Sequence, residues 1–481
     1  MSVIASDAAG RQAGELTASD FEVKDNGVAR RIEAFQILRP STELLRQRVP
    51  VEYTESNRPL NEAGSQQPVN VVLMDTAHID PEFQPWAVAQ VTRLFSFLRP
   101  GDDVALYELT REGLTLRHQF SHSAVHLTAS LVPNAVHWDE AANEFKVDVK
   151  QASVLDGAVA QDLERETRDS VFLDQRNAEI ATSIANIADW MKQFAGRKNL
   201  FWISSSFPPV SAQSGKPHAA LVRMLQALDG ANVAVYPVEV RSAVPPVPFL
   251  TIRPGSEASL PRARRRTMPE QFRSMRWIAG ATGGLVVSNR SQLGEALFDR
   301  MRQTRFSYLI TFDAPASDMN GQFHRLQVTL KRHDLNWVAR QTYFAGPIAA
   351  NSSAGNETFG TKLFPTADVS LSVRVGQEQS GSQSVIVRVP EQRPALDKVR
   401  VYLENAVAGA AHREAAQAAA SISKTSERPG IDEFVLTVPA GGQRDASAIW
   451  RVRAEDEASK SRGSLTLCRF LSKMLASESL P

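Results

Sequence analysis

The sequence predicts an α/β protein in which a doubly wound, mostly parallel sheet is flanked by β-sandwich domains. Between Val69 and Arg302, apolar runs typical of buried strands alternate with amphipathic segments of helical period. On either side of this region hydrophobicity repeats every second residue, as it does in half-buried strands. With 481 residues the chain is too long for one hydrophobic core, so two to four domains are expected.

Residues 1–40 predict a β-hairpin region. FEV alternates, KDNG supplies a turn at Asn26-Gly27, and RRIEAFQIL returns as the second strand. Forty residues are too few to bury a core, so we expect this region to pair with strands predicted in 305–345 as one discontinuous β-sandwich. Residues 41–68 are polar, contain three prolines and show no sustained period, which predicts a linker.

The central region, 69–302, predicts a sheet of about six strands with helices on both faces. Residues 141–195 are expected to be helical, and residues 242–270 a loop rich in proline and arginine. The strands are expected at VNVVLM, VALYEL, LTLRHQF, NLFWISS, NVAVYPVEV and LVVS, and further helices at PEFQPWAVAQVTRLFSFL, HAALVRMLQALDGA, FRSMRWIAGATGG and SQLGEALFDRMRQT.

The last third predicts a second β-sandwich. Three strands, FSYLITFDAP, HRLQVTLKRH and NWVARQTYFA, first complete the 305–345 segment. Residues 346–360 are small and polar, which indicates a linker, and alternating strands then recur through 361–481. REAAQAAASIS is compatible with a helix or a strand, and the tail CRFLSKMLASESLP with a short amphipathic helix.

Composition excludes several classes of function. Lys+Arg 54 against Asp+Glu 53 leaves a net charge of +1, so no nucleic-acid partner is expected, and the basic run at 261–266 is interpreted as a solvated loop. The single Cys468 rules out a disulfide framework within the chain and a cysteine-based zinc site. No apolar run approaches the length of a transmembrane segment, and MSVIASDAAGRQ lacks the apolar core of a signal peptide.

Four segments carry a family resemblance: LTASDFEVKDNGVARRIEAF, GRKNLFWISSSFP, NVAVYPVEVR, and IAGATGGLVVSN with the YLITFDAP and GQFHRLQVTLKR that follow it. In this order they resemble the VWFA-related proteins common in Acidobacteria, and 69–302 resembles the von Willebrand factor type A domain. The resemblance covers roughly residues 1–345. It implies a bacterial protein-binding or adhesion module in an extracytoplasmic location, periplasmic or secreted.

The resemblance also implies a divalent cation at the top of the sheet, held by an Asp-x-Ser-x-Ser loop with a threonine and a second aspartate from later loops. The matching loop here runs from Asp75 to Ile79, and Ala77 and Ile79 offer no side-chain oxygen. Ser205 stands at the position of the second aspartate, and Thr182 or Thr110 is the nearest threonine. We therefore expect a degenerate metal site and no cofactor, with Mg²⁺ at Asp75 as the alternative.

In this interpretation the Asp75 carboxylate caps its own loop, and Asp80, which precedes a proline, caps the next helix. The rim of the sheet is then a surface for a protein partner of unknown identity, without enzymatic activity. The residues expected at this partner-binding rim are Asp75, Thr76, His78, Ser204 and Ser205.

Other functions remain as alternatives. A structural scaffold in an envelope assembly would use the core only to organise the flanking sandwiches. A hydrolase would use the Ser204–Ser206 region as nucleophile, with a histidine base and an acid brought close by the fold. A zinc site would use His118, His122 and His126, which share a face if the segment is helical, although the pattern there favours a strand.

Overall fold

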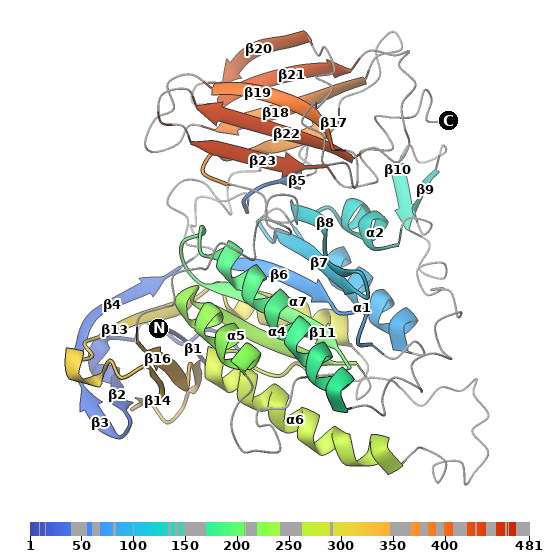
Figure 1. Cartoon of the computed structure of the whole chain (residues 1–481). Helices are drawn as coiled ribbons and strands as arrows, with labels where there is room; N and C mark the ends of the chain where they lie inside the picture. The colour runs from blue at the N-terminus through green and yellow to red at the C-terminus, as the bar shows by residue number, and fades with distance from the viewer. Residues whose placement is uncertain are drawn as a thin grey trace.

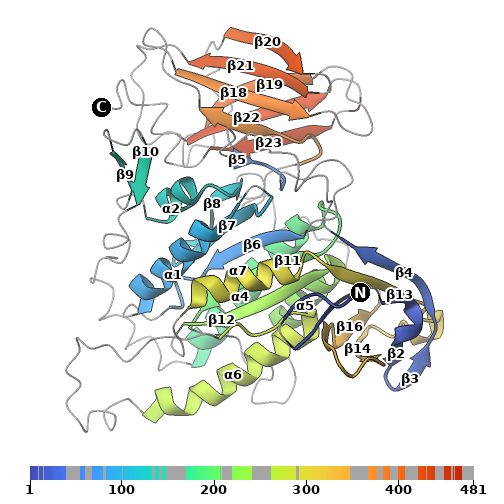
Figure 2. The same cartoon turned by 180° about the vertical axis from the view of Figure 1, so that it is seen from behind.

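The structure is a computed structural model in which a central mixed sheet carries helices on both faces (Figures 1 and 2). A β-sandwich built from the N-terminal residues lies on one side of a central mixed sheet, and a second one lies above it. The structure describes residues 1–39, 55–59, 68–79, 83–99, 101–132, 136–139, 144–147, 170–205, 207, 219–240, 262–288, 292–346, 367–375, 383–390, 399–406, 421–428, 431–438, 449–456, 459 and 461–467, except for residues 9 and 15.

The largest sheet has ten strands. Their order is β12 (Val233–Glu239), β11 (Lys198–Ser204), β6 (Val69–Met74), β7 (Val104–Thr110), β8 (Gly113–Ser121), β5 (Glu55–Ser56), β17 (Ser372–Val375), β18 (Gln383–Pro390), β21 (Ile431–Val438) and β20 (Ser421–Arg428). The three pairings among β12, β11, β6 and β7 are parallel. The six pairings from β7 to β20 are antiparallel.

The predicted fold class, a doubly wound and mostly parallel sheet flanked by sandwich domains, is wrong. Antiparallel pairings outnumber parallel ones in the ten-stranded sheet, and the other described sheets are antiparallel throughout. Strand also exceeds helix among the described residues. The central sheet does not end at a domain boundary either, because β5 continues it into the strands of the C-terminal region.

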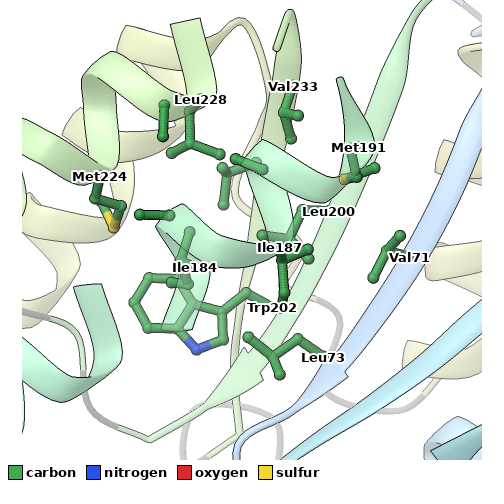
Figure 3. Packing of buried hydrophobic residues seen from close by; sticks show 14 of the residues in the cluster. Val71, Leu73, Ile184, Ile187, Met191, Leu200, Trp202, Met224, Leu228 and Val233 are labelled. Carbon is green, nitrogen blue, oxygen red and sulfur yellow. The ribbon is translucent and has the colours of Figure 1, made fainter. Parts of the chain in front are cut away.

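Helices pack on both faces of the parallel strands. On one face, Val71 and Leu73 contact a cluster that includes Trp202 and residues of α4 (Ser170–Met191), α5 (Ala219–Gly230) and α6 (Arg262–Thr282) (Figure 3). On the other face, Val72 and Met74 join residues of α1 (Gln84–Phe97), α2 (Ala124–Leu131) and α7 (Leu293–Gln303). Because both faces of β6 are covered by helices, its sequence VNVVLM is apolar on both faces.

The N-terminal sandwich consists of two four-stranded sheets. One has the order β15 (Asn336–Ala339), β1 (Ser2–Ser6), β13 (Ser307–Phe312) and β4 (Ile32–Leu38). The other has the order β16 (Thr342–Ala345), β14 (Gln322–Leu330), β2 (Phe21–Asp25) and β3 (Val28–Arg30), and the 3₁₀ turns η1 (Ala18–Asp20) and η8 (Ala316–Asp318) lie at its ends. Residues 1–40 and 305–345 thus share both sheets, and positive φ at Asn26 and Gly27 closes the β2–β3 turn.

The C-terminal region packs β17, β18, β21 and β20 against a three-stranded sheet of β19 (Val399–Ala406), β22 (Ile449–Asp456) and β23 (Arg462–Thr466). Asn57, which follows β5, ties this region to the core. Its Nδ2 donates to the Val369 carbonyl and its Oδ1 accepts from the Leu371 N–H, both at 2.8 Å. Glu55 and Ser56 lie within the segment predicted to be a linker, and they instead form a strand of the largest sheet.

Local predictions also differ from the structure. The helix predicted at 141–195 is interrupted, because β10 (Glu144–Val147) pairs with β9 (Val136–Asp139). Helix α6 begins at Arg262, inside the predicted loop and within the basic run. The single strand expected at NWVARQTYFA is two strands, β15 and β16, in different sheets. Asp80, the tail and the 346–360 linker beyond Gly346 lie outside the described residues.

Candidate functional site

Asp75 ends the central strand β6, at the rim where the parallel strands finish. Its N–H donates to the Ile203 carbonyl at 3.0 Å, which extends the pairing of β6 with β11 by one residue. Its carbonyl accepts from the N–H groups of His78 and Ile79, each at 3.1 Å, so the chain turns immediately. This turn encloses Asp75 fully, with none of its surface exposed.

Both carboxylate oxygens of Asp75 are used inside the protein. His78 Nδ1 lies 2.5 Å from Oδ1. Oδ2 accepts from Ser204 Oγ at 2.9 Å and from Trp202 Nε1 at 3.2 Å, and both donors lie on the neighbouring strand β11. The carboxylate therefore joins the loop after β6 to the end of β11, because these donors are buried and each gives it a hydrogen bond.

The other residues expected around Asp75 face in different directions. Thr76 Oγ1 donates to Glu108 Oε1 at 2.7 Å, and Glu108 is ion-paired with Arg117. Ile79 is buried in the cluster under α1, and Ala77 packs on the opposite cluster. Of the two candidate threonines, Thr110 donates to Glu112 at 2.8 Å and Thr182 is exposed on α4. Neither is brought to the carboxylate by a contact among the described residues.

Ser205 follows β11 and is buried, and its Oγ has no hydrogen-bond partner among the described residues. A hard dication needs several oxygen ligands in near-octahedral geometry, with carboxylates to balance its charge. At the rim the Asp75 carboxylate has both oxygens engaged by protein groups, and the nearby Glu108 carboxylate is engaged by Thr76 and Arg117. The described part of the chain brings together no three His, Cys, Asp or Glu side chains in a metal-like group. The residues present therefore do not fit a Mg²⁺ site.

Ser204 and Ser205, the described serines of the predicted nucleophile region, do not form a hydrolase triad either. A nucleophilic serine needs a histidine between it and the acid, so that the ring can take the hydroxyl proton. Here the acid is in the middle, since Asp75 contacts Ser204 through one oxygen and His78 through the other. Ser204 is fully buried, and Ser206 lies outside the described residues.

The three histidines of the zinc alternative have separate surroundings. His118 lies in β8, with Nδ1 2.7 Å from the Gln119 carbonyl oxygen and Nε2 3.1 Å from Glu55 Oε1. His122 Nδ1 lies 2.8 Å from Asp103 Oδ1, and His126 lies in α2. Burial lowers the pKa of His118 to about 3 and that of His126 to about 4. Because His118 lies in β8 and His126 in α2, the three histidines do not share one face of a helix.

A second site, which the sequence did not predict, is a groove of about 1010 Å³ where the N-terminal sandwich meets the helical core. Its walls are the C-terminal half of α6 with residues 284–288, the second half of β14, and β15. We call it the α6–β14–β15 groove. Four cationic side chains line it and no carboxylate does so among the described residues; the cations are Lys24, Arg276, Arg325 and Arg340.

The four cations of the α6–β14–β15 groove are not equivalent. Arg340 is buried and ion-paired with Asp229, and burial together with the nearby Arg197 lowers its pKa to about 10. Lys24, Arg276 and Arg325 make no ion pair with any described residue. This site could not be predicted from the sequence, because the three residues come from segments about 250 and 50 positions apart and are brought together only by the fold.

None of the helices in the described portion of the chain is both long enough and apolar enough to cross a bilayer. Comparison with known proteins does not supply an identity: no family model matches this chain, and no curated protein matches it either.

Proposed function

We propose that this chain is a non-enzymatic protein-binding module in which Asp75 marks a degenerate metal site. The observation that carries the proposal is that His78, Trp202 and Ser204 engage both oxygens of the fully buried Asp75 carboxylate. A carboxylate that closes its own loop in this way stabilises the scaffold and has only one of about four lone-pair sites left for an ion. The rim is then held rigid without a cation, which favours a partner contact that does not depend on one.

The contact surface in this proposal is the α6–β14–β15 groove rather than the side chains at the end of β6. Asp75, Ser204 and Ser205 are each at most 2% exposed, so they cannot touch a partner without local opening. The groove instead offers unpaired cations and the indole of Trp337, which is 39% exposed. Exposed aromatic and arginine side chains together are typical of protein interfaces.

Calorimetry on the full chain tests the metal-independent half of the proposal. Titration with MgCl₂ and with MnCl₂ should give no saturable binding in the micromolar range, and Asp75→Asn should behave like the wild type. Asparagine is the matched substitution, because it keeps the size of the side chain and removes the charge. Saturable binding that Asp75→Asn abolishes would overturn the degenerate-site reading.

Affinity capture tests the other half. Immobilised full chain should retain the same protein from cell extract in EDTA and in MgCl₂, and that protein should bind again after purification. A partner retained only in MgCl₂ contradicts metal independence. If no purified candidate rebinds, the chain is not the binding module that we propose.

A further inference from the structure

We infer that the α6–β14–β15 groove binds an acidic polypeptide segment in extended conformation, which adds as a strand to the edge of β15. The inference rests on the proposed protein-binding function and specifies the place and the kind of partner. It follows from three properties of the groove: two free strand edges, unpaired cations, and an apolar lining beside an exposed tryptophan.

Both strands that border the groove are edges where they face it. β15 is the last strand of its sheet, paired with β1 on one side only. β14 is covered by β16 as far as Arg325, and the Leu326 N–H still reaches the Gln341 carbonyl at 2.8 Å. From Gln327 onward no described strand covers that side of β14. Edge strands carry rows of unpaired N–H and C=O groups, which are templates for an added strand.

The register shows which groups of β15 point into the groove. The Ala5 carbonyl accepts from the Ala13 N–H at 3.1 Å, on the side of β1 away from β15. In an antiparallel strand the N–H and C=O of one residue point the same way and alternate along the chain. Ile4 therefore bonds with its partner Val338, and the backbone groups of Trp337 and Ala339 point outward.

The same reasoning applies to β14. The Val328 carbonyl accepts from Trp337 Nε1 at 3.1 Å, so it points away from β2, and its own N–H points the same way. The Trp337 indole thereby bridges the two edges and is held at the mouth of the groove. An added strand on β15 would have this ring as a fixed apolar neighbour.

The charge of the groove selects an acidic partner. Lys24 on β2, Arg325 on β14 and Arg276 on α6 line the groove from three elements without a carboxylate partner. Glu22, opposite Thr329 in the β14–β2 pair, is the acidic residue on the same face of β2 as Lys24, and it does not line the groove. Cations around a concave surface attract carboxylates and repel basic segments, which gives specificity as well as a faster encounter.

The groove favours a polypeptide over a nucleic acid or a sulfated glycan. Phe272, Leu285 and Val286 supply an apolar floor, which suits the alternate side chains of an extended peptide. The outward N–H groups of β15 and β14 give a peptide backbone partners that a phosphate chain does not match in spacing. A polyanion of another class would use the cations alone.

Fluorescence anisotropy with a labelled ten-residue peptide of alternating Glu and Val tests the inference on the full chain. Binding should be saturable and weakened by added NaCl, and the Lys–Val analogue should not bind. Arg325→Glu should weaken binding roughly tenfold, since it removes one attraction and adds one repulsion. Arg111→Glu is the matched control, an exposed arginine in the β7–β8 turn, and should change the affinity less than about twofold.

Two N-methylated peptides separate strand addition from charge attraction without altering the protein. Methylation of the Glu amides and methylation of the Val amides block opposite edges of the extended peptide, and only one edge can face β15. One methylated peptide should therefore bind at least about tenfold more weakly than the unmethylated peptide, and the other should bind with nearly the same affinity. Equal binding of both, or tighter binding of an oligothymidylate or of heparin, overturns strand addition. If no peptide binds while the captured partner binds the wild type and Arg325→Glu equally well, the groove is not the contact; protein binding as such then stands, but with its surface elsewhere on the chain.

Discussion

Asp75→Ala is the most informative single perturbation, because a loop-fastening carboxylate and a metal ligand give opposite results in the absence of metal. The substitution removes the acceptor of three hydrogen bonds at a site with no exposed surface. It leaves His78 Nδ1, Trp202 Nε1 and Ser204 Oγ without their partner. Alanine also leaves a small void, which is a minor effect next to the three unpaired donors.

The magnitude follows from those donors. A buried polar group left unsatisfied costs about 1–3 kcal/mol. Two of the three can relax in part, since the Ser204 hydroxyl can rotate and His78 can take its other tautomer. Trp202 Nε1 cannot, because its ring is fully buried against the α4 and α5 residues. We therefore expect Asp75→Ala to destabilise β6 and β11 by roughly 3–5 kcal/mol in EDTA.

Hydrogen exchange measured by mass spectrometry is the appropriate assay, because a multidomain chain need not unfold in two states. Peptides covering β6 and β11 should exchange faster in Asp75→Ala, whereas β22 should be unchanged. Ser204→Ala, which removes one donor and leaves the carboxylate, should cost only about 1 kcal/mol. Two results together would refute this explanation: a change in local stability of less than about 1 kcal/mol for Asp75→Ala in EDTA, and slower exchange of wild-type β6 and β11 in MgCl₂. The carboxylate would then be a metal ligand.

Two further predictions concern Asn57 and His126. Asn57→Ala removes the partners of the Val369 carbonyl and the Leu371 N–H, so the protection of β17 against hydrogen exchange should decrease by roughly 2–4 kcal/mol. Unchanged exchange would show that β5 alone holds the C-terminal region. Burial lowers the pKa of His126 to about 4, whereas the unfolded side chain titrates near 6.5. Between about pH 6.5 and 4 the unfolded chain therefore binds a proton that the folded chain does not bind, so the stability of the fold decreases as the pH falls through this range. Between pH 6.5 and 5, the free energy of unfolding measured by urea titration should therefore fall by roughly 2 kcal/mol less in His126→Leu than in the wild type. An equal decrease in the two proteins would contradict this prediction.

The elements of this chain were easier to predict than their partners. VNVVLM and NLFWISS are buried strands, and the helices at 219–230 and 293–303 were expected close to where they occur. Periodicity reports which face of a segment is buried, but not the neighbour with which a strand pairs. The antiparallel turn of β8 onto β7 and the insertion of Glu55–Ser56 between β8 and β17 are therefore invisible to it. Those pairings make the sheet mixed, and they are the reason that the predicted fold class is wrong.

At the rim, the sequence alone shows that Ala77 and Ile79 have no side-chain oxygen, whereas the donors that bind the Asp75 carboxylate could be predicted only in part. Ser204 lay within the predicted rim, but Trp202 was interpreted as one more apolar residue of a buried strand. A tryptophan is both, since its ring packs in the core while its N–H needs an acceptor. The exposure of the rim could not be predicted, because it depends on how the turn after β6 folds back over its own carboxylate.

The groove arises from a corner that sequence periodicity hides. NWVARQTYFA alternates without a break, yet Gln341 divides it: its N–H donates to the Gly280 carbonyl at 2.9 Å, and its carbonyl accepts from the Leu326 N–H. The chain before this point pairs with β1 and the chain after it with β14, so the two sheets separate beside α6. One continuous strand would have closed the sandwich with a ladder, whereas the corner leaves two free edges facing the cations, which is the arrangement that an added acidic strand requires.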